Sequence, residues 1–155
     1  MARTVVDVGG LIAVVVSLVF VGLEVRQNTA ATRSMTQQAI FATGAELGIN
    51  VMSNERLRDV LAAAESDLQS LPAKGSPDYI MLNMFFSQRF NYMENAFFHH
   101  SQGTLATELW SGTDAWIRSV VGTPIYRYFW SELGTAYMPS FQQYTNSILA
   151  SASGN

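Results

Sequence analysis

The chain has 155 residues and a net charge of −3, and only 14% of its residues are charged. It contains no cysteine, which excludes disulfides, thiolate catalysis and cysteine-bound zinc or iron–sulfur centres within this chain. Lys74 is the single lysine, and a protein that binds phosphate backbones needs a basic surface, so we expect no nucleic-acid partner.

A long apolar run lies close to the amino terminus. Residues 8–23, VGGLIAVVVSLVFVGL, contain no charge and no proline, and Asp7 and Glu24 bound them. A helix from Thr4 to Val25 would be about 33 Å long, close to the thickness of the hydrocarbon core of a membrane. The sequence therefore predicts a transmembrane anchor over residues 1–27.

Three other interpretations compete with the anchor, and the run is longer than a buried strand, which usually has about 3–10 residues. A cleaved signal peptide needs a site with small residues, and only Asn28–Ala30 offers a weak one. A buried helix of a soluble protein would have to be surrounded on all sides, which a small domain rarely achieves. The basic residues at the two ends of the run are nearly balanced, so the orientation in the membrane stays open.

The segment after the anchor is predicted to continue the helix or to restart it after a break near Asn28–Thr29. Gly44 and Gly48 lie four residues apart, so they share one side of this helix. Such a pair either lets another helix approach closely, which includes self-association, or only weakens the helix.

Five further helices are predicted from capping and turn residues. Ser53 or Asn54 caps the first of them, Ser76-Pro77 begins the next, and Gly103 ends it. The other expected boundaries are Thr104 as the next cap, Gly122-Thr123-Pro124 as a turn, and Pro139 at the start of the last helix. In the helix after Thr104 we expect a close approach at Gly112, within a packed stripe of Leu105, Leu109, Gly112, Trp116 and Val120. The fold class is therefore all-α, with one N-terminal transmembrane helix continuing into a small bundle of about five helices over residues 28–155.

The candidate metal ligands are Glu94, His99, His100 and Glu108. Carboxylates and imidazoles bind divalent cations, but adjacent histidines point about 100° apart on a helix and do not easily serve one ion. The structural alternative places both histidines at the negative end of their helix and pairs Glu94 with a buried group such as Arg89. We favour the structural alternative, and we predict no cofactor, no metal and no catalytic residue.

Two aromatic residues, Trp110 and Tyr128, lie off the predicted packing stripes and are candidate interface residues. Together with the anchor and the lack of a catalytic motif, they favour a non-enzymatic accessory or interaction subunit of a larger membrane complex, of the respiratory or photosynthetic kind. Its partners would be the lipid bilayer and other membrane subunits. The alternatives are a helical membrane protein that binds a metal or small ligand, and a self-associating scaffold.

Two stretches carry a resemblance to a known group of proteins. They are VGLEVRQNTAATR at residues 21–33 and MENAFFHHSQGTLATELW at residues 93–110. With these motifs the chain resembles a group of uncharacterised bacterial proteins that have an apolar N-terminal segment and an all-helical domain. The matching positions are Arg26, Gln27, Asn28, Ala31, Thr32, Arg33, Glu94, Asn95, His100, Gly103, Leu105, Glu108 and Trp110. The resemblance implies the bacterial inner membrane and this architecture, and it implies no activity.

Overall fold

A computed structural model describes residues 2–152, with side chains described from Val14 onward. Over this range the protein has six α-helices, two short 3-10 turns and no strand. The chain divides into two units, Met1–Met35 and Thr36–Asn155, and the division falls inside the first helix. Residues 28–35, which the sequence had assigned to the helical domain, are thus part of the first unit.

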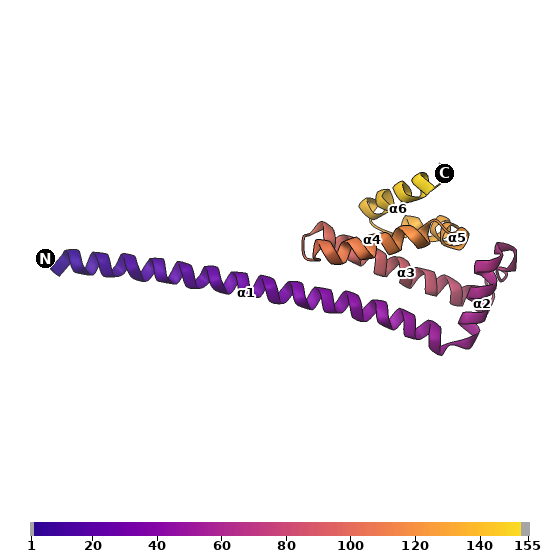
Figure 1. Ribbon diagram of the computed structural model, residues 1–155, viewed down its shortest axis with the longest axis horizontal. Coiled ribbons are helices and arrows are strands. Elements are labelled where there is room, and N and C mark those ends of the chain that lie inside the picture. Colours follow the sequence, from indigo (N-terminus) through magenta and orange to yellow (C-terminus); the bar gives the residue numbers. More distant parts are fainter. Residues whose placement is uncertain (1, 153–155) are drawn as a thin grey trace. The chain divides into compact units, whose positions relative to one another are not determined.

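The first helix, α1, runs from Ala2 to Ser53 without a break (Figure 1). The prediction that it continues past Asn28–Thr29 is confirmed, because threonines 29 and 32 bond back to carbonyls one turn earlier and the helix does not stop there. Among the described residues, this is the one helix long and apolar enough to span a membrane. The apolar side chains from Val14 to Val25 are between 52% and 66% exposed.

Helices α2 (Glu55–Ser66) and α3 (Pro77–Ser101) begin where the sequence predicts. The Asn54 side chain accepts the backbone N–H of Leu57, and the Ser76 hydroxyl accepts that of Tyr79, so each cap satisfies a free donor of its helix. A 3-10 turn, η1 (Leu68–Ser70), lies between the two helices. Gly103, with φ +68°, takes the left-handed conformation just past the end of α3.

The predicted cap of the fourth helix is wrong. Helix α4 runs from Thr107 to Val121, and its cap position is Ala106, not Thr104. The Thr104 hydroxyl instead donates to the carbonyl of His99, which also accepts the backbone N–H groups of Thr104 and Leu105. Thr104 is therefore part of the end of α3 and is not available to begin α4.

The predicted stripe on α4 is also partly wrong. Its fully buried residues are Ile117 and Val121, while Trp116 and Val120 are half-buried. A methyl group placed on Gly112 would meet no neighbour within 4 Å, so no helix approaches closely there. The buried face of α4 is rotated by about one residue from the predicted one, since Ile117 and Val121 are buried in place of Trp116 and Val120.

The remaining helices are α5 (Pro124–Leu133) and α6 (Pro139–Ala152), with a 3-10 turn, η2 (Gly134–Ala136), between them. Figure 1 shows α3 and α4 lying antiparallel, and α6 packs on both. The core is rich in aromatic residues and is centred on α3. Phe86 is fully buried, stacks on Phe129 with ring centroids 4.3 Å apart, and meets Tyr126 edge-on at 5.0 Å.

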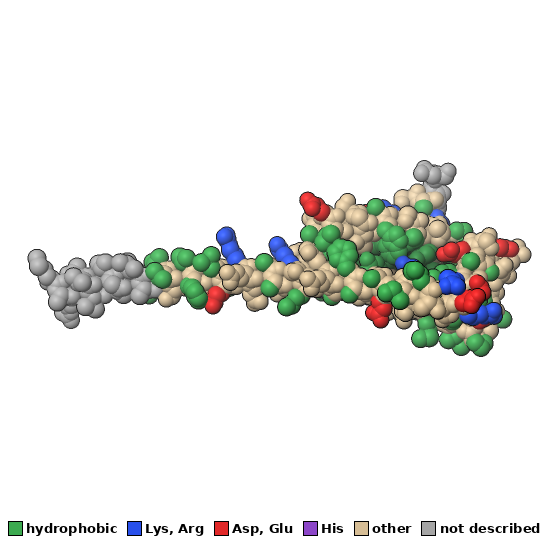
Figure 2. All heavy atoms as spheres, turned by 60° about the horizontal axis from the view of Figure 1, so that its bottom comes forward, with side chains coloured by type: hydrophobic (Ala, Val, Ile, Leu, Met, Phe, Trp, Pro, Cys, Tyr) green, Lys and Arg blue, Asp and Glu red, His purple; other side chains and the backbone are tan. Residues whose placement is uncertain are grey.

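Charged side chains are unevenly distributed over the helical domain. On the face in Figure 2, acidic and basic side chains gather around α2, and hydrophobic side chains are spread over the rest of the domain. Two ion pairs tie this end of the domain together: Arg56 with Asp78, and Lys74 with Glu132. The two basic side chains are 66% and 62% exposed, so solvent screens both pairs and each adds little stability.

Candidate functional site

Tyr92 of α3 occupies the space that Gly44 leaves on α1. A methyl group on Gly44 would lie 3.3 Å from the Tyr92 ring, a tight contact that would require the ring to shift by a few tenths of an ångström. Ile40 and Leu47, one turn to either side of Gly44, are buried, and Ile40 packs on Ala96 and Leu105. The part of α1 within the helical domain is thus fixed against α3 around Tyr92. At Gly44 a side chain, the Tyr92 ring, comes close, and a methyl group on Gly48 would meet nothing within 4 Å, so the predicted role of this glycine pair in helix association stays a prediction.

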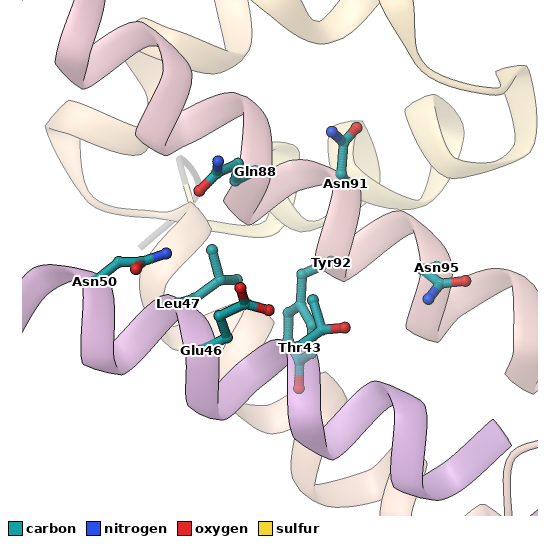
Figure 3. Close-up of a pocket in the computed structure, with 8 residues that line it drawn as sticks. All are labelled: Thr43, Glu46, Leu47, Asn50, Gln88, Asn91, Tyr92 and Asn95. Atoms are coloured by element: carbon teal, nitrogen blue, oxygen red, sulfur yellow. The ribbon is translucent and has the colours of Figure 1, made fainter. Parts of the chain in front are cut away.

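Two grooves flank Tyr92. The first, the amide groove, has a volume of about 410 Å³. Its lining residues are Thr43, Glu46, Leu47, Asn50, Gln88, Asn91, Tyr92 and Asn95. Figure 3 shows Tyr92 reaching from α3 to α1 beside Thr43, with Glu46, Asn50 and Gln88 on one side of it and Asn95 on the other. The four amides can donate hydrogen bonds to a polar ligand and accept them from it, and the carboxylate of Glu46 can accept charge-assisted ones.

The second groove, the Arg89 groove, has a volume of about 380 Å³. Its lining residues are Phe41, Gly44, Ala45, Leu47, Arg89, Tyr92 and Trp116. The Arg89 guanidinium carbon lies 5.1 Å from the centre of the Phe85 ring and 5.5 Å from that of Trp116. Burial raises the pKa of Tyr92, while the positive charge of Arg89 acts in the opposite direction.

The predicted metal candidates are occupied by structural contacts. Glu94 does not pair with Arg89; its carboxylate accepts the backbone N–H of Met138, at 2.6 Å, just before α6. His99 Nδ1 lies 2.9 Å from the Thr104 hydroxyl. Because that hydroxyl donates its hydrogen to the His99 carbonyl, Nδ1 must carry a hydrogen and donate it to the hydroxyl oxygen.

The contacts of His100 and Glu108 differ from those of Glu94 and His99. The His100 ring stacks on Trp110, with centroids 4.6 Å apart and planes inclined by 6°, and its buried Nδ1 has no hydrogen-bond partner. Glu108 is exposed in the first turn of α4. Among the residues whose side chains are described, no three His, Asp or Glu side chains come together as a metal site would require. Glu94 and His99 thus make contacts within the fold, and the prediction that none of the four residues binds a metal stays a prediction.

The two aromatic interface candidates both pack within the domain. Trp110 contacts His100, Phe97 and Tyr144, and Tyr128 lies against Phe129, with its hydroxyl 3.4 Å from that of Tyr79. Each is half-buried. Their predicted role at an interface with a partner stays a prediction.

Asp114 joins α4 to α6 and gives the domain a pH-dependent contact. Its carboxylate accepts the Tyr144 hydroxyl and the Arg118 Nε–H, the latter at 2.8 Å. Burial on its own would raise the pKa of Asp114, but the bonds from Arg118 and Tyr144 together lower it below the ordinary value.

Replacement of Asp114 with asparagine tests this contact. A carboxyl group with a lowered pKa in the folded state stabilises fully above its unfolded pKa of about 4, and that stability is lost as the pH falls through the folded value. Asp114→Asn should therefore lower the unfolding free energy at pH 6, and its difference from the parent should shrink as the pH falls below about 4. Urea unfolding of both proteins across this range measures the difference. A difference that is independent of pH would contradict the assignment.

Comparison of the chain with known protein families, curated proteins and solved structures finds no match. The site therefore rests on its own geometry. The sequence marks Gly44 and Arg89 separately, and it does not predict that they line the same groove. The grooves arise because α1 and α3 meet around Tyr92, and no local pattern in the sequence marks that pairing.

Proposed function

We propose that the chain is a single-pass membrane protein whose α1 anchors a helical domain that binds another membrane subunit, without an enzymatic activity of its own. The observation that carries this proposal is the apolar run of α1. Its described side chains from Val14 to Val25 are all exposed, although nine of them are large and hydrophobic. Each such side chain gains roughly 1.5–3 kcal/mol on leaving water, and a lipid bilayer supplies the apolar surroundings along the whole segment.

The interaction role is supported by exposed apolar side chains beyond the anchor. Phe41, Ile49 and Met52 of α1 are 58%, 62% and 74% exposed. With Ala45 they follow one side of the helix, at the spacing by which an amphipathic helix presents a contact face. They carry no charge, and a helix of a partner subunit could bury them. The resemblance to bacterial proteins suggests that the membrane is the inner membrane of a bacterium.

The experiment is to solubilise native membranes in a mild detergent and to size the particle that contains this chain. We expect a particle much larger than the 17.1 kDa chain, with a fixed set of other subunits. In the variant Ile49→Glu, the charge on the contact face should release the chain from that particle, while the domain stays folded because Ile49 is exposed.

The matched control is Gln143→Glu, which adds the same charge at an exposed position of α6. This variant should stay in the large particle. Recovery of the parent chain as a monomer from native membranes would contradict the interaction role, and equal behaviour of the two variants would contradict the assigned face.

A further inference from the structure

Arg89 is a cation without a carboxylate partner. The described ion pairs of the helical domain join Arg56 to Asp78, Lys74 to Glu132 and Arg118 to Asp114, and none of them includes Arg89. Its Nε is buried and has no hydrogen-bond partner. The rings of Phe85 and Trp116 offset part of the cost of this burial through cation–π contacts, but they accept no strong hydrogen bond. Arg89 lines the groove and belongs to none of these ion pairs, so its positive charge is available to an acidic group there.

The rest of the Arg89 groove is uncharged. Phe41, Ala45, Leu47 and Trp116 offer apolar surface, and Tyr92 adds a ring whose edge meets Trp116 at a centroid distance of 5.8 Å. The carboxylate of Glu46 belongs to the lining of the other groove. A ligand that complements this lining carries one negative charge on an apolar body. The volume of about 380 Å³ lies within the range of small-molecule sites.

We propose that the Arg89 groove binds a monocarboxylate with a hydrocarbon body, that is, a fatty acid. The carboxylate lies on the planar guanidinium, whose parallel N–H groups match its two oxygens. The hydrocarbon chain lies along Phe41, Ala45 and Trp116. One cation balances one carboxylate, whereas a doubly charged phosphate monoester would leave a charge unpaired in an otherwise apolar groove. This binding function goes beyond the anchoring and interaction roles. Phe41 and Ala45 line the groove and also belong to the contact face, so the binding is tested in the absence of partner subunits.

The test is a titration of the full chain, in nanodiscs of phosphatidylcholine, with decanoate labelled with ¹³C at the carboxyl carbon. The ¹³C signal of decanoate dissolved in lipid is measured in nanodiscs without the chain and subtracted. The parent chain should show saturable binding of one decanoate. Arg89→Gln should weaken the binding about tenfold or more, because it removes a charge-assisted, two-point hydrogen bond. The uncharged 1-decanol, which has the same hydrocarbon body, should show no saturable binding.

A second variant covers the case in which Arg89→Gln disturbs folding. Ala45 lines the groove from an exposed position of α1, so Ala45→Phe fills the groove while Arg89 stays in place. It should abolish decanoate binding. Ala42→Phe, at an exposed position that lines neither groove, is the matched control and should bind like the parent. No saturable binding to the parent, or equal binding by the Ala45→Phe and Ala42→Phe variants, would overturn the proposal.

Discussion

Replacing Phe86 with alanine is expected to lower the unfolding free energy of the helical domain by about 3–5 kcal/mol, the usual cost of removing a buried phenylalanine ring. Phe86 has no exposed surface and lies at the centre of the aromatic core. Its ring stacks on Phe129 and meets Phe85 and Tyr126 edge-on. The neighbouring rings are rigid and cannot close the cavity that the alanine would leave, so the cost should lie in the upper half of this range.

Urea unfolding of the full chain in detergent, followed by tryptophan fluorescence, measures this loss. Phe98→Ala is the matched control on the same helix, because Phe98 is 42% exposed. It should cost about 0.5 kcal/mol or less, as substitutions at the surface usually do. Equal losses in the two variants would contradict a core centred on Phe86.

The second large effect concerns the anchor. Val19 lies near the middle of the apolar run, and an arginine there should block stable membrane insertion of α1. A charged residue at the centre of a membrane-spanning helix costs about 2.5–3.5 kcal/mol on insertion scales, and this run is only just long enough to span the bilayer. The short length leaves little apolar surface to offset the charge.

The amount of chain in the membrane fraction measures the effect. Val19→Arg should move most of the chain to the soluble or aggregated fraction. Gln38→Arg adds the same charge at an exposed position outside the apolar run and should leave the distribution unchanged. Retention of the Val19→Arg variant in the membrane at the parental level would show that this segment does not span the bilayer.

Helix boundaries that depend on local chemistry could be predicted from the sequence. Asn54 and Ser76 cap their helices through side-chain bonds within three residues, and Pro124 and Pro139 begin helices because proline lacks the N–H that the first turn does not use. The prediction failed at Thr104, where the same residue type ends one helix instead of beginning the next. The competing bond to the His99 carbonyl depends on how the chain turns at Gly103, which a capping pattern does not show.

The candidate site could not be predicted in the same way. Arg89 was expected to pair with a buried carboxylate such as Glu94, which lies five residues away on the same helix. Instead Glu94 bonds to the backbone before α6, and Arg89 lies against Trp116 of α4. Residues five apart point about 140° apart on a helix, so they contact different neighbours. Which neighbours these are is decided by packing between helices distant in the sequence.

The central claim is that α1 anchors this chain in a membrane. Extraction of native membranes with alkaline carbonate, followed by mass measurement of the chain that stays in the pellet, tests it most directly. An inserted helix resists carbonate and is not cleaved, so we expect the chain to stay in the pellet at a mass that includes residues 1–30. Release of the chain into the supernatant, or a mature chain that begins after residue 30, would contradict the anchor and the membrane function built on it.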